Sequence, residues 1–342
     1  MQYIDFVKNL ADDLQEEFEK RNIDVKVEVR KVEKHWGTEL GIEVSNEKCS
    51  NPIIYPNDLY ERHEAGQNYG FLLDVCVDRI EDALDNTPIF LSHDLDSLKD
   101  SITLHVINME KAKKYLKDKP YKEFEDLAII YKLNFNVGNN EKGSATVTLS
   151  MMERLGFTAE ELHQFAIERF AINSPCLIEN LSEALRRLEP ELFADVPDSP
   201  LTVVTNKDYT LGAGIVFCPG VLDKCADIMN GNFYVLPSSV HEMLICREND
   251  TMSIKKLEEI VSTANEMEVK EEEFLSDNVY HYDWKEKVFE LAEKYEARMK
   301  EKAKQSLMGN LESKKYDVAR DDHLRRNQDI GSRRTQGGSL CL

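Results

Sequence analysis

The segment Leu201 to Asp283 constrains the fold of this chain more than any other, because strand, turn and helix signals follow one another there without interruption. Its predicted strands cover 201–205, 212–218, 233–236 and 243–246, and its predicted helices cover 220–229 and 253–265. Turns rich in Gly, Pro, Asn and Ser separate these elements. The order strand, strand, helix, strand, strand, helix is typical of an α+β unit with a mainly antiparallel sheet.

The residues before this segment also alternate between helices and short strands. Apolar residues at steps of three and four predict a helix over 3–21, and period-two alternation predicts a hairpin of strands 25–29 and 40–44. Thr158 and Glu161 have the spacing of a capping box, which predicts the start of a helix. The other predicted helices cover 59–62, 71–84, 111–116 and 177–188, and the other predicted strands cover 52–55, 102–106, 127–137 and 145–149.

We therefore expect an α+β protein with mainly antiparallel sheets, packed helices, a C-terminal helix and a disordered tail. The expected parts are an N-terminal α+β part over 1–100, a second α+β part over 101–283, a charged helix over 284–308 and a disordered tail over 309–342. The charged helix is indicated by an apolar stripe of Trp284, Val288, Leu291 and Tyr295. The tail has few apolar residues, which is typical of disorder.

The net charge of the 342-residue chain is −21, and it is unevenly distributed. Residues 1–283 carry 29 basic and 54 acidic side chains, whereas residues 284–342 carry 14 basic and 10 acidic ones. An acidic body repels a phosphate backbone, so a protein partner is a better hypothesis for it than nucleic acid. The tail could bind an acidic partner through Arg325, Arg326, Arg333 and Arg334.

Cysteine usage and hydropathy indicate the compartment. The seven cysteines form no CxxC motif and most lie in apolar runs, which predicts buried reduced thiols. Cys218 precedes Pro219-Gly220 and a predicted helix, where a thiol can be reactive, but a cysteine that ends an apolar strand is more often part of the core. The acidic start does not resemble a signal peptide, and no apolar run is long enough to span a membrane. We expect a soluble, cytoplasmic protein.

The first candidate site is the segment Pro237 to Glu242, where Ser238, Ser239, His241 and Glu242 bring hydroxyls, an imidazole and a carboxylate together. A hydrolase nucleophile would need a supporting motif such as GxSxG, which is absent. A strand over 240–246 would also point His241 and Glu242 to opposite faces. The alternative is that a serine caps a turn and His241 lies at a strand end.

The second candidate site consists of Asp277, His281 and Asp283, which are metal-ligand residue types close together in sequence. Their spacing matches no known metal signature. The alternative is a surface turn that Tyr280 and Tyr282 anchor. We expect no cofactor, since Gly212-Ala213-Gly214 is not followed by a phosphate-loop pattern.

Several segments together resemble the domain-of-unknown-function family 5688 of Gram-positive gut bacteria. They are NPIIYPNDLYERHEAG, FEDLAIIYKLNFNV, LGFTAEELHQFA, TNKDYTLGAGIVFCPGVL, NFYVLPSSVHEMLI and LSDNVYHYD. The resemblance covers about residues 1–283 and departs from the family at Cys218, where an aromatic residue is usual. It implies a bacterial, cytoplasmic protein, and it supplies no reaction, cofactor or catalytic residue.

The absence of a complete catalytic constellation favours a protein-binding or regulatory module. The alternative is a hydrolase-type enzyme that uses the segment Pro237 to Glu242.

Overall fold

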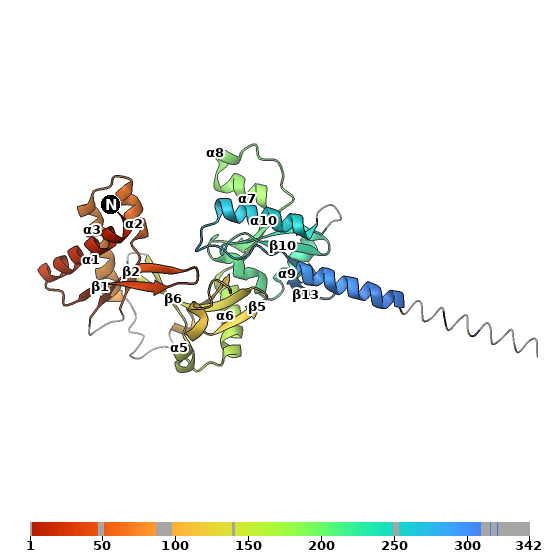
Figure 1. The fold of residues 1–342 in the computed structure, drawn as a ribbon, viewed down its shortest axis with the longest axis horizontal. Helices are drawn as coiled ribbons and strands as arrows, with labels where there is room; N and C mark the ends of the chain where they lie inside the picture. Colours follow the sequence, from red (N-terminus) through yellow and green to blue (C-terminus); the bar gives the residue numbers. More distant parts are fainter. Residues whose placement is uncertain are drawn as a thin grey trace, which may run out of the picture. The chain divides into compact units, whose positions relative to one another are not determined.

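The computed structural model describes residues 2–46, 51–86, 98–138, 141–248 and 253–308, together with Lys315 and Arg320. The chain forms two compact units, Met1–Phe289 and Glu290–Leu342. Figure 1 shows helices and antiparallel sheets, so the predicted α+β class is confirmed. The predicted disordered tail over 309–342 lies outside the described residues, except for Lys315 and Arg320.

The beginning of the larger unit is a three-stranded sheet covered by helices. Its strands are β1 (Lys26–Glu33), β2 (Thr38–Ser45) and β3 (Ile53–Ile54), and its helices are α1 (Tyr3–Lys20), α2 (Asn57–Glu64) and α3 (Tyr69–Asn86). β1 and β2 pair antiparallel, which confirms the predicted hairpin. The helices and strands share a core that includes Phe6, Leu10, Leu14, Ile42, Leu59 and Leu72. This separate core agrees with an N-terminal part over 1–100, whose boundary stays a prediction.

The second sheet is antiparallel, with β6 in its middle. Its strands are β4 (Ile102–Asn108), β5 (Tyr121–Phe124), β6 (Leu127–Gly138) and β7 (Glu141–Thr146). β6 pairs with each of the others, and it confirms the strand predicted over 127–137. β7 begins four residues before the strand predicted over 145–149, and β5 had no clear sequence signal. The helix predicted over 111–116 is instead a turn followed by the 3-10 helix η1 (Tyr115–Asp118).

Helices follow this sheet. α5 (Leu149–Arg154) comes first, and α6 (Ala159–Asn173) then packs on β4. The predicted capping box is confirmed, because the Thr158 hydroxyl accepts from the Glu161 backbone and the Glu161 carboxylate accepts from the Thr158 backbone.

The third sheet contains the C-terminal segment of the larger unit. Its order is β13-β12-β10-β11-β9-β8, with β8 (Cys176–Asn180), β9 (Thr202–Asn206), β10 (Phe233–Pro237), β11 (Met243–Arg247), β12 (Tyr280–Asp283) and β13 (Val288–Leu291). The flanking helices are α7 (Leu181–Leu188), α8 (Pro190–Phe193), α9 (Val221–Met229) and α10 (Ile254–Glu268). Most strands and both helices predicted in the segment 201–283 are confirmed.

The helix predicted over 177–188 begins four residues later, at Leu181. Residues 176–180 pair with β9 as the edge strand β8. Asn180 then caps α7, because its side-chain oxygen accepts from the backbone N–H of Ser182. The Asn side chain, which favours a helix N-terminus, divides strand from helix here.

The strand predicted over 212–218 is wrong, because Gly212–Phe217 form the buried 3-10 helix η2. Leu211 turns the chain with a φ of 53°. A Cβ at Gly212 would lie 2.3 Å from the Thr205 hydroxyl oxygen, and a Cβ at Gly214 would lie 2.3 Å from a Leu104 methyl carbon. The two glycines therefore let a tight helix pack closely against β9 and β4.

The charged helix predicted from Trp284 begins at residue 292 instead. Asp283 Oδ1 accepts from the backbone N–H groups of Lys285 and Glu286, and Lys287 has a φ of 56°, so the chain turns and continues as β13. Within the smaller unit, the helix over 292–308 places Arg298 2.7 Å from Glu290. Within the described ranges, no helix combines the length and the hydropathy that a membrane span requires.

Candidate functional site

The segment Ser238 to Glu242 is a turn between β10 and β11. The strand predicted over 240–246 begins only at Met243, so strand alternation does not separate His241 from Glu242. Ser239 Oγ donates to Glu242 Oε1 at 3.1 Å and accepts from the His241 backbone N–H at 3.0 Å. The serine therefore stabilises the turn, in agreement with the alternative of a turn-capping serine, and its hydroxyl is directed to Glu242 and not to the imidazole.

The His241 imidazole is held at both ring nitrogens. Its Nδ1 accepts from the Leu211 backbone N–H at 3.1 Å, and its Nε2 lies 3.4 Å from Glu273 Oε1. Because Nδ1 accepts, the neutral ring carries its proton on Nε2 and directs it toward Glu273. His241 therefore has no free lone pair with which to accept a proton from a serine.

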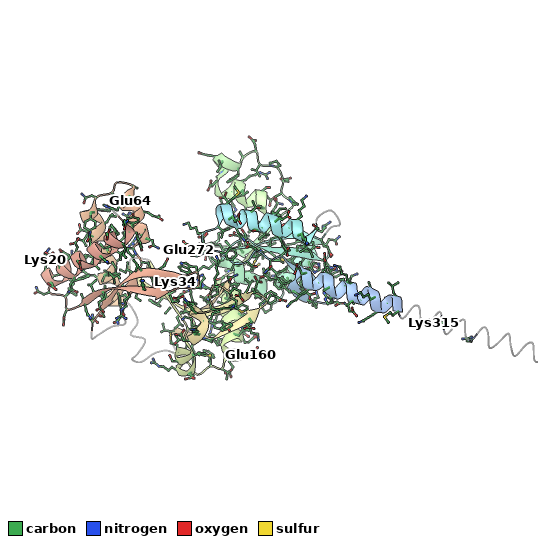
Figure 2. The ribbon with its side chains drawn as sticks, viewed as in Figure 1. Lys20, Lys34, Glu64, Glu160, Glu272 and Lys315 are labelled. Atoms are coloured by element: carbon green, nitrogen blue, oxygen red, sulfur yellow. The ribbon has the colours of Figure 1, made fainter. Side chains whose placement is uncertain are left out.

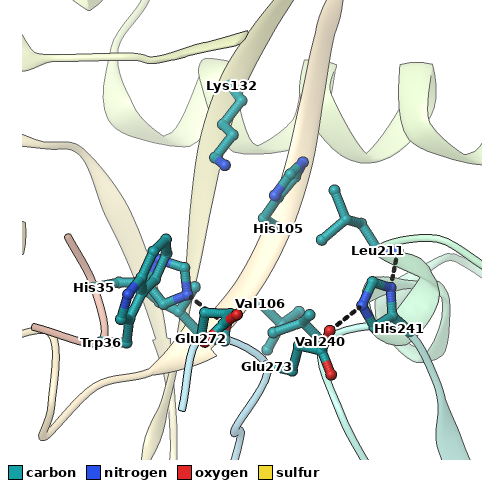
Figure 3. A pocket seen from close by; sticks show the side chains of 11 residues that line it. His35, Trp36, His105, Val106, Lys132, Leu211, Val240, His241, Glu272 and Glu273 are labelled. Carbon is teal, nitrogen blue, oxygen red and sulfur yellow. Dashed lines mark hydrogen bonds and ion pairs between the residues drawn. The ribbon is translucent and has the colours of Figure 1, made fainter. Parts of the chain in front are cut away.

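His241 lines a pocket of about 210 Å³ that Figure 3 shows from close by. The other lining residues come from the β1–β2 connection, from β4 and β6, and from the segments around 211, 240 and 272: His35, Trp36, His105, Val106, Ile107, Lys132, Leu211, Val240, Glu272 and Glu273. Lys34 precedes His35, whose Nε2 lies 3.2 Å from the Glu272 carbonyl oxygen, and Figure 2 labels Lys34 and Glu272 in this region. The pocket is thus assembled from segments that are far apart in sequence.

His105 and Lys132 lie on the same face of neighbouring strands. Lys132 pairs with Thr103, which is two residues from His105 on β4, and side chains two apart share a face. His105 is 8% exposed, and burial holds its pKa well below the usual range, with Lys132 adding to the shift. Burial also lowers the pKa of Lys132. Among the described residues, no hydrogen bond or ion pair links either side chain to another residue.

The end of the β1–β2 hairpin adds an aromatic ring and two basic groups. The His35 ring packs edge-on against Trp36, with the ring centres 4.3 Å apart. Its Nε2 lies 3.2 Å from the Glu272 carbonyl oxygen. Burial, with Lys132 adding to it, lowers the pKa of His35 to about 4. Burial lowers the pKa of Lys34 to about 8, and its ammonium lies 3.4 Å from the centre of the Tyr55 ring.

The three residues of the second candidate site have separate partners. Asp277 Oδ1 accepts from Asn265 Nδ2 at 2.8 Å, fully buried His281 lies 3.3 Å from Glu248, and Asp283 accepts from backbone N–H groups. In the part of the chain that the structure describes, no group of three or more His, Cys, Asp or Glu is placed to hold a metal ion. The hydroxyls of Tyr280 and Tyr282 donate to Asp126 and Asp223, so these tyrosines anchor the segment.

The thiols are free and largely buried wherever the structure describes them. Cys76, Cys218, Cys225 and Cys246 are buried, and Cys176 is half-buried. Burial raises the pKa of Cys218 to about 12, which disfavours the reactive thiolate. Cys49 and Cys341 lie outside the described residues.

The sequence did not single out His35, His105 or Lys132, because they are scattered along the chain as isolated polar residues. One signal was present: His105 and Lys132 interrupt the apolar strand segments ITLHVIN and IIYKLNF. A titratable residue within such a segment is either a core residue whose polar atoms are hydrogen-bonded or part of a functional site, and only the fold distinguishes the two.

A protein-family model described as "Family of unknown function (DUF5688)" matches residues 3–284. No curated protein and no solved structure matches the chain.

Proposed function

The chain belongs to the DUF5688 family, and we propose that it is a binding or regulatory module that holds a small molecule in the pocket around His105 and Lys132. The observation that carries the proposal is that both side chains face the pocket and lack a partner among the described residues. Even partial burial of a polar or cationic group without a partner has a desolvation cost, which a bound ligand can offset. Such groups are concentrated at functional sites, where a ligand supplies the missing partner.

The dimensions of the pocket favour a small ligand. Its volume of about 210 Å³ lies below the range of roughly 300–1,000 Å³ that is typical of sites for drug-sized molecules. Val106, Ile107 and Val240 provide apolar surface, and Trp36 provides an aromatic ring. A few polar groups within an apolar wall are the usual composition of a small-molecule site.

We place this module in the bacterial cytoplasm, where free thiols stay reduced. The acidic body, with 54 acidic and 29 basic side chains over 1–283, favours a protein partner over nucleic acid. The excess of basic residues after 283 favours an acidic partner for that part of the chain. Ligand binding next to the β1–β2 hairpin would then regulate the interaction with the protein partner.

Tryptophan fluorescence tests the binding function, because the chain has only two tryptophans and only Trp36 lines this pocket. In full-length protein with Trp284→Phe, Trp36 is the only indole, and a metabolite that enters the pocket will change its emission. The matched control is Trp36→Phe, in which the remaining Trp284 should give no response to the same metabolite. If no compound in a broad metabolite library affects Trp36 selectively, the proposed function is wrong.

A second candidate function is a hydrolase-type enzyme, which is favoured by the His241–Glu273 pair in the same pocket. In such an enzyme Glu273, and not Ser238 or Ser239, would activate a water molecule. A panel of ester, amide and phosphoester substrates, assayed with the full chain and with Glu273→Gln, tests this candidate. Turnover that the variant lacks would support it, and absence of turnover in the unmodified protein would eliminate it.

A further inference from the structure

We infer that the pocket binds the oxyanion of a small molecule, a carboxylate or a phosphate group, between Lys132 and His105. The inference rests on the proposed binding function and specifies the chemistry of the ligand. Its two central observations are the placement of both side chains on one face of β4 and β6, and the absence of a partner for either among the described residues.

The two side chains supply suitable donors for an oxyanion. The Lys132 ammonium has three N–H donors, and neutral His105 donates from whichever ring nitrogen carries its proton. Lys132 lies diagonally across the strand pair from His105, a separation that long side chains bridge. An oxyanion with two or three oxygens can therefore accept from both at once. Figure 3 shows both side chains directed into the same part of the pocket.

The charges around this point favour an anion. The chain carries a net charge of −21, yet the Lys34 ammonium, whose pKa is about 8, adds a second cationic group near Lys132. The proximity of these groups is evident from their electrostatic effects, since Lys132 disfavours the charged forms of Lys34, His35 and His105. An oxyanion would relieve the repulsion between the Lys132 and Lys34 ammonium groups and replace the hydration that Lys132 has lost.

The carboxylates of the pocket do not neutralise Lys132. Glu273 is paired with His241, and Glu272 is exposed and contacts His35 through its backbone carbonyl. Figure 3 shows both glutamates on the side of the pocket opposite Lys132. The anion site at Lys132 is thus separate from the side of the pocket that holds the two glutamates. Hydrogen-bond donors elsewhere on the ligand can bind to the glutamate side.

Two probes test the inference on the full chain: inorganic phosphate and acetate, each compared with chloride at equal ionic strength. A bound anion stabilises the folded state by mass action, so thermal unfolding and calorimetric titration both report it. We expect phosphate or acetate to stabilise the unmodified protein. The larger response identifies the class, a phosphate group in one case and a carboxylate in the other.

Lys132→Met is the decisive variant, because it removes the charge and keeps a chain of similar length. Loss of a charge-assisted hydrogen bond predicts binding that is roughly tenfold to a hundredfold weaker. The matched control is Lys122→Met on β5, a neighbour of β6 in the same sheet, where the lysine is 49% exposed and paired with Glu160. The control should bind the anion as the unmodified protein does.

Two outcomes overturn the inference. One is that neither anion stabilises the unmodified protein, and the other is that Lys132→Met binds the anion with unchanged affinity. The Trp36 fluorescence assay keeps these results distinct from a failure of the proposed function. A metabolite that changes Trp36 emission with the same affinity in Lys132→Met would leave the binding function intact and eliminate the oxyanion site.

Discussion

Tyr280 donates its hydroxyl to Oδ1 of Asp126, which lies 154 residues earlier in the chain. Asp126 also accepts from Ser276 Oγ and from Asn278 Nδ2 at 2.9 Å. One carboxylate in the connection between β5 and β6 thus fixes the segment that leads into β12. Burial raises the pKa of fully buried Tyr280 above its usual value, with Asp126 adding to the shift, so the hydroxyl remains a donor.

Asp126→Ala should lower the free energy of unfolding by about 2–4 kcal/mol, because it leaves a buried tyrosine hydroxyl and two further donors without their acceptor. Tyr280→Phe should have a smaller effect of about 1–2 kcal/mol, since it removes one donor and leaves the carboxylate with two others. Urea unfolding measures both. Equal effects of the two variants would contradict the role of Asp126 as a shared acceptor.

Gly212→Ala should destabilise the protein by several kcal/mol. Its Cβ would lie 2.3 Å from Thr205 Oγ1, 2.7 Å from the Asn206 nitrogen and 2.8 Å from the His241 oxygen, and two of these atoms belong to the backbone. The matched control is Gly70→Ala in α3, where the nearest atom is a side-chain oxygen 3.2 Å away. Thermal unfolding of the two variants should differ clearly, and similar melting temperatures would contradict the close packing at η2.

Thr158→Ala should cost about 1 kcal/mol of stability, because it removes the N-cap of α6. Thr158→Ser retains the hydroxyl and should stay within a few tenths of a kcal/mol of the unmodified protein. Chemical denaturation with both variants checks the prediction. A serine variant as unstable as the alanine variant would show that the threonine methyl, and not the cap, is responsible.

The stability should fall as the pH decreases from about 6.5 to about 4. Burial holds the folded-state pKa of His35 at about 4, below its usual value of 6.5, so in this window the unfolded chain binds the additional proton. The stabilisation is present above pH 6.5 and is lost as the pH falls through the folded-state pKa, with a magnitude of up to about 3 kcal/mol.

His35→Asn should reduce this pH dependence, as measured by urea unfolding at pH 7 and at pH 5. The remaining dependence should include His105, whose pKa burial also lowers. If the slope of stability against pH is unchanged in His35→Asn, the ring is not buried in its neutral form. The carboxylates titrate equally in both proteins, so the comparison isolates the histidine.

Local signals predicted the regular elements well. The capping box at Thr158, the α1 stripe and the β1–β2 alternation needed only neighbouring residues to define them. Predictions were wrong where a tertiary contact decided the conformation. Residues 212–217 have the apolar composition of a strand, but Gly212 and Gly214 pack as a 3-10 helix against β9 and β4.

The candidate site shows the same division. The sequence identified the turn at 237–242 and therefore His241, but it associated the imidazole with Ser238, Ser239 and Glu242 because they are adjacent. In the fold, Nε2 of His241 is directed toward Glu273 and its ring lines a pocket with His105 and Lys132.

The sequence by itself determined the α+β class, most helices and strands, the acidic charge and the family, since each depends on local periodicity, composition or motif. Only the tertiary structure decided that His35, His105, Lys132 and His241 line one pocket, since strand pairing and the position of the β1–β2 hairpin bring them together. The spacing of these four residues along the chain does not indicate that they lie close together, because contacts between distant segments arise from packing.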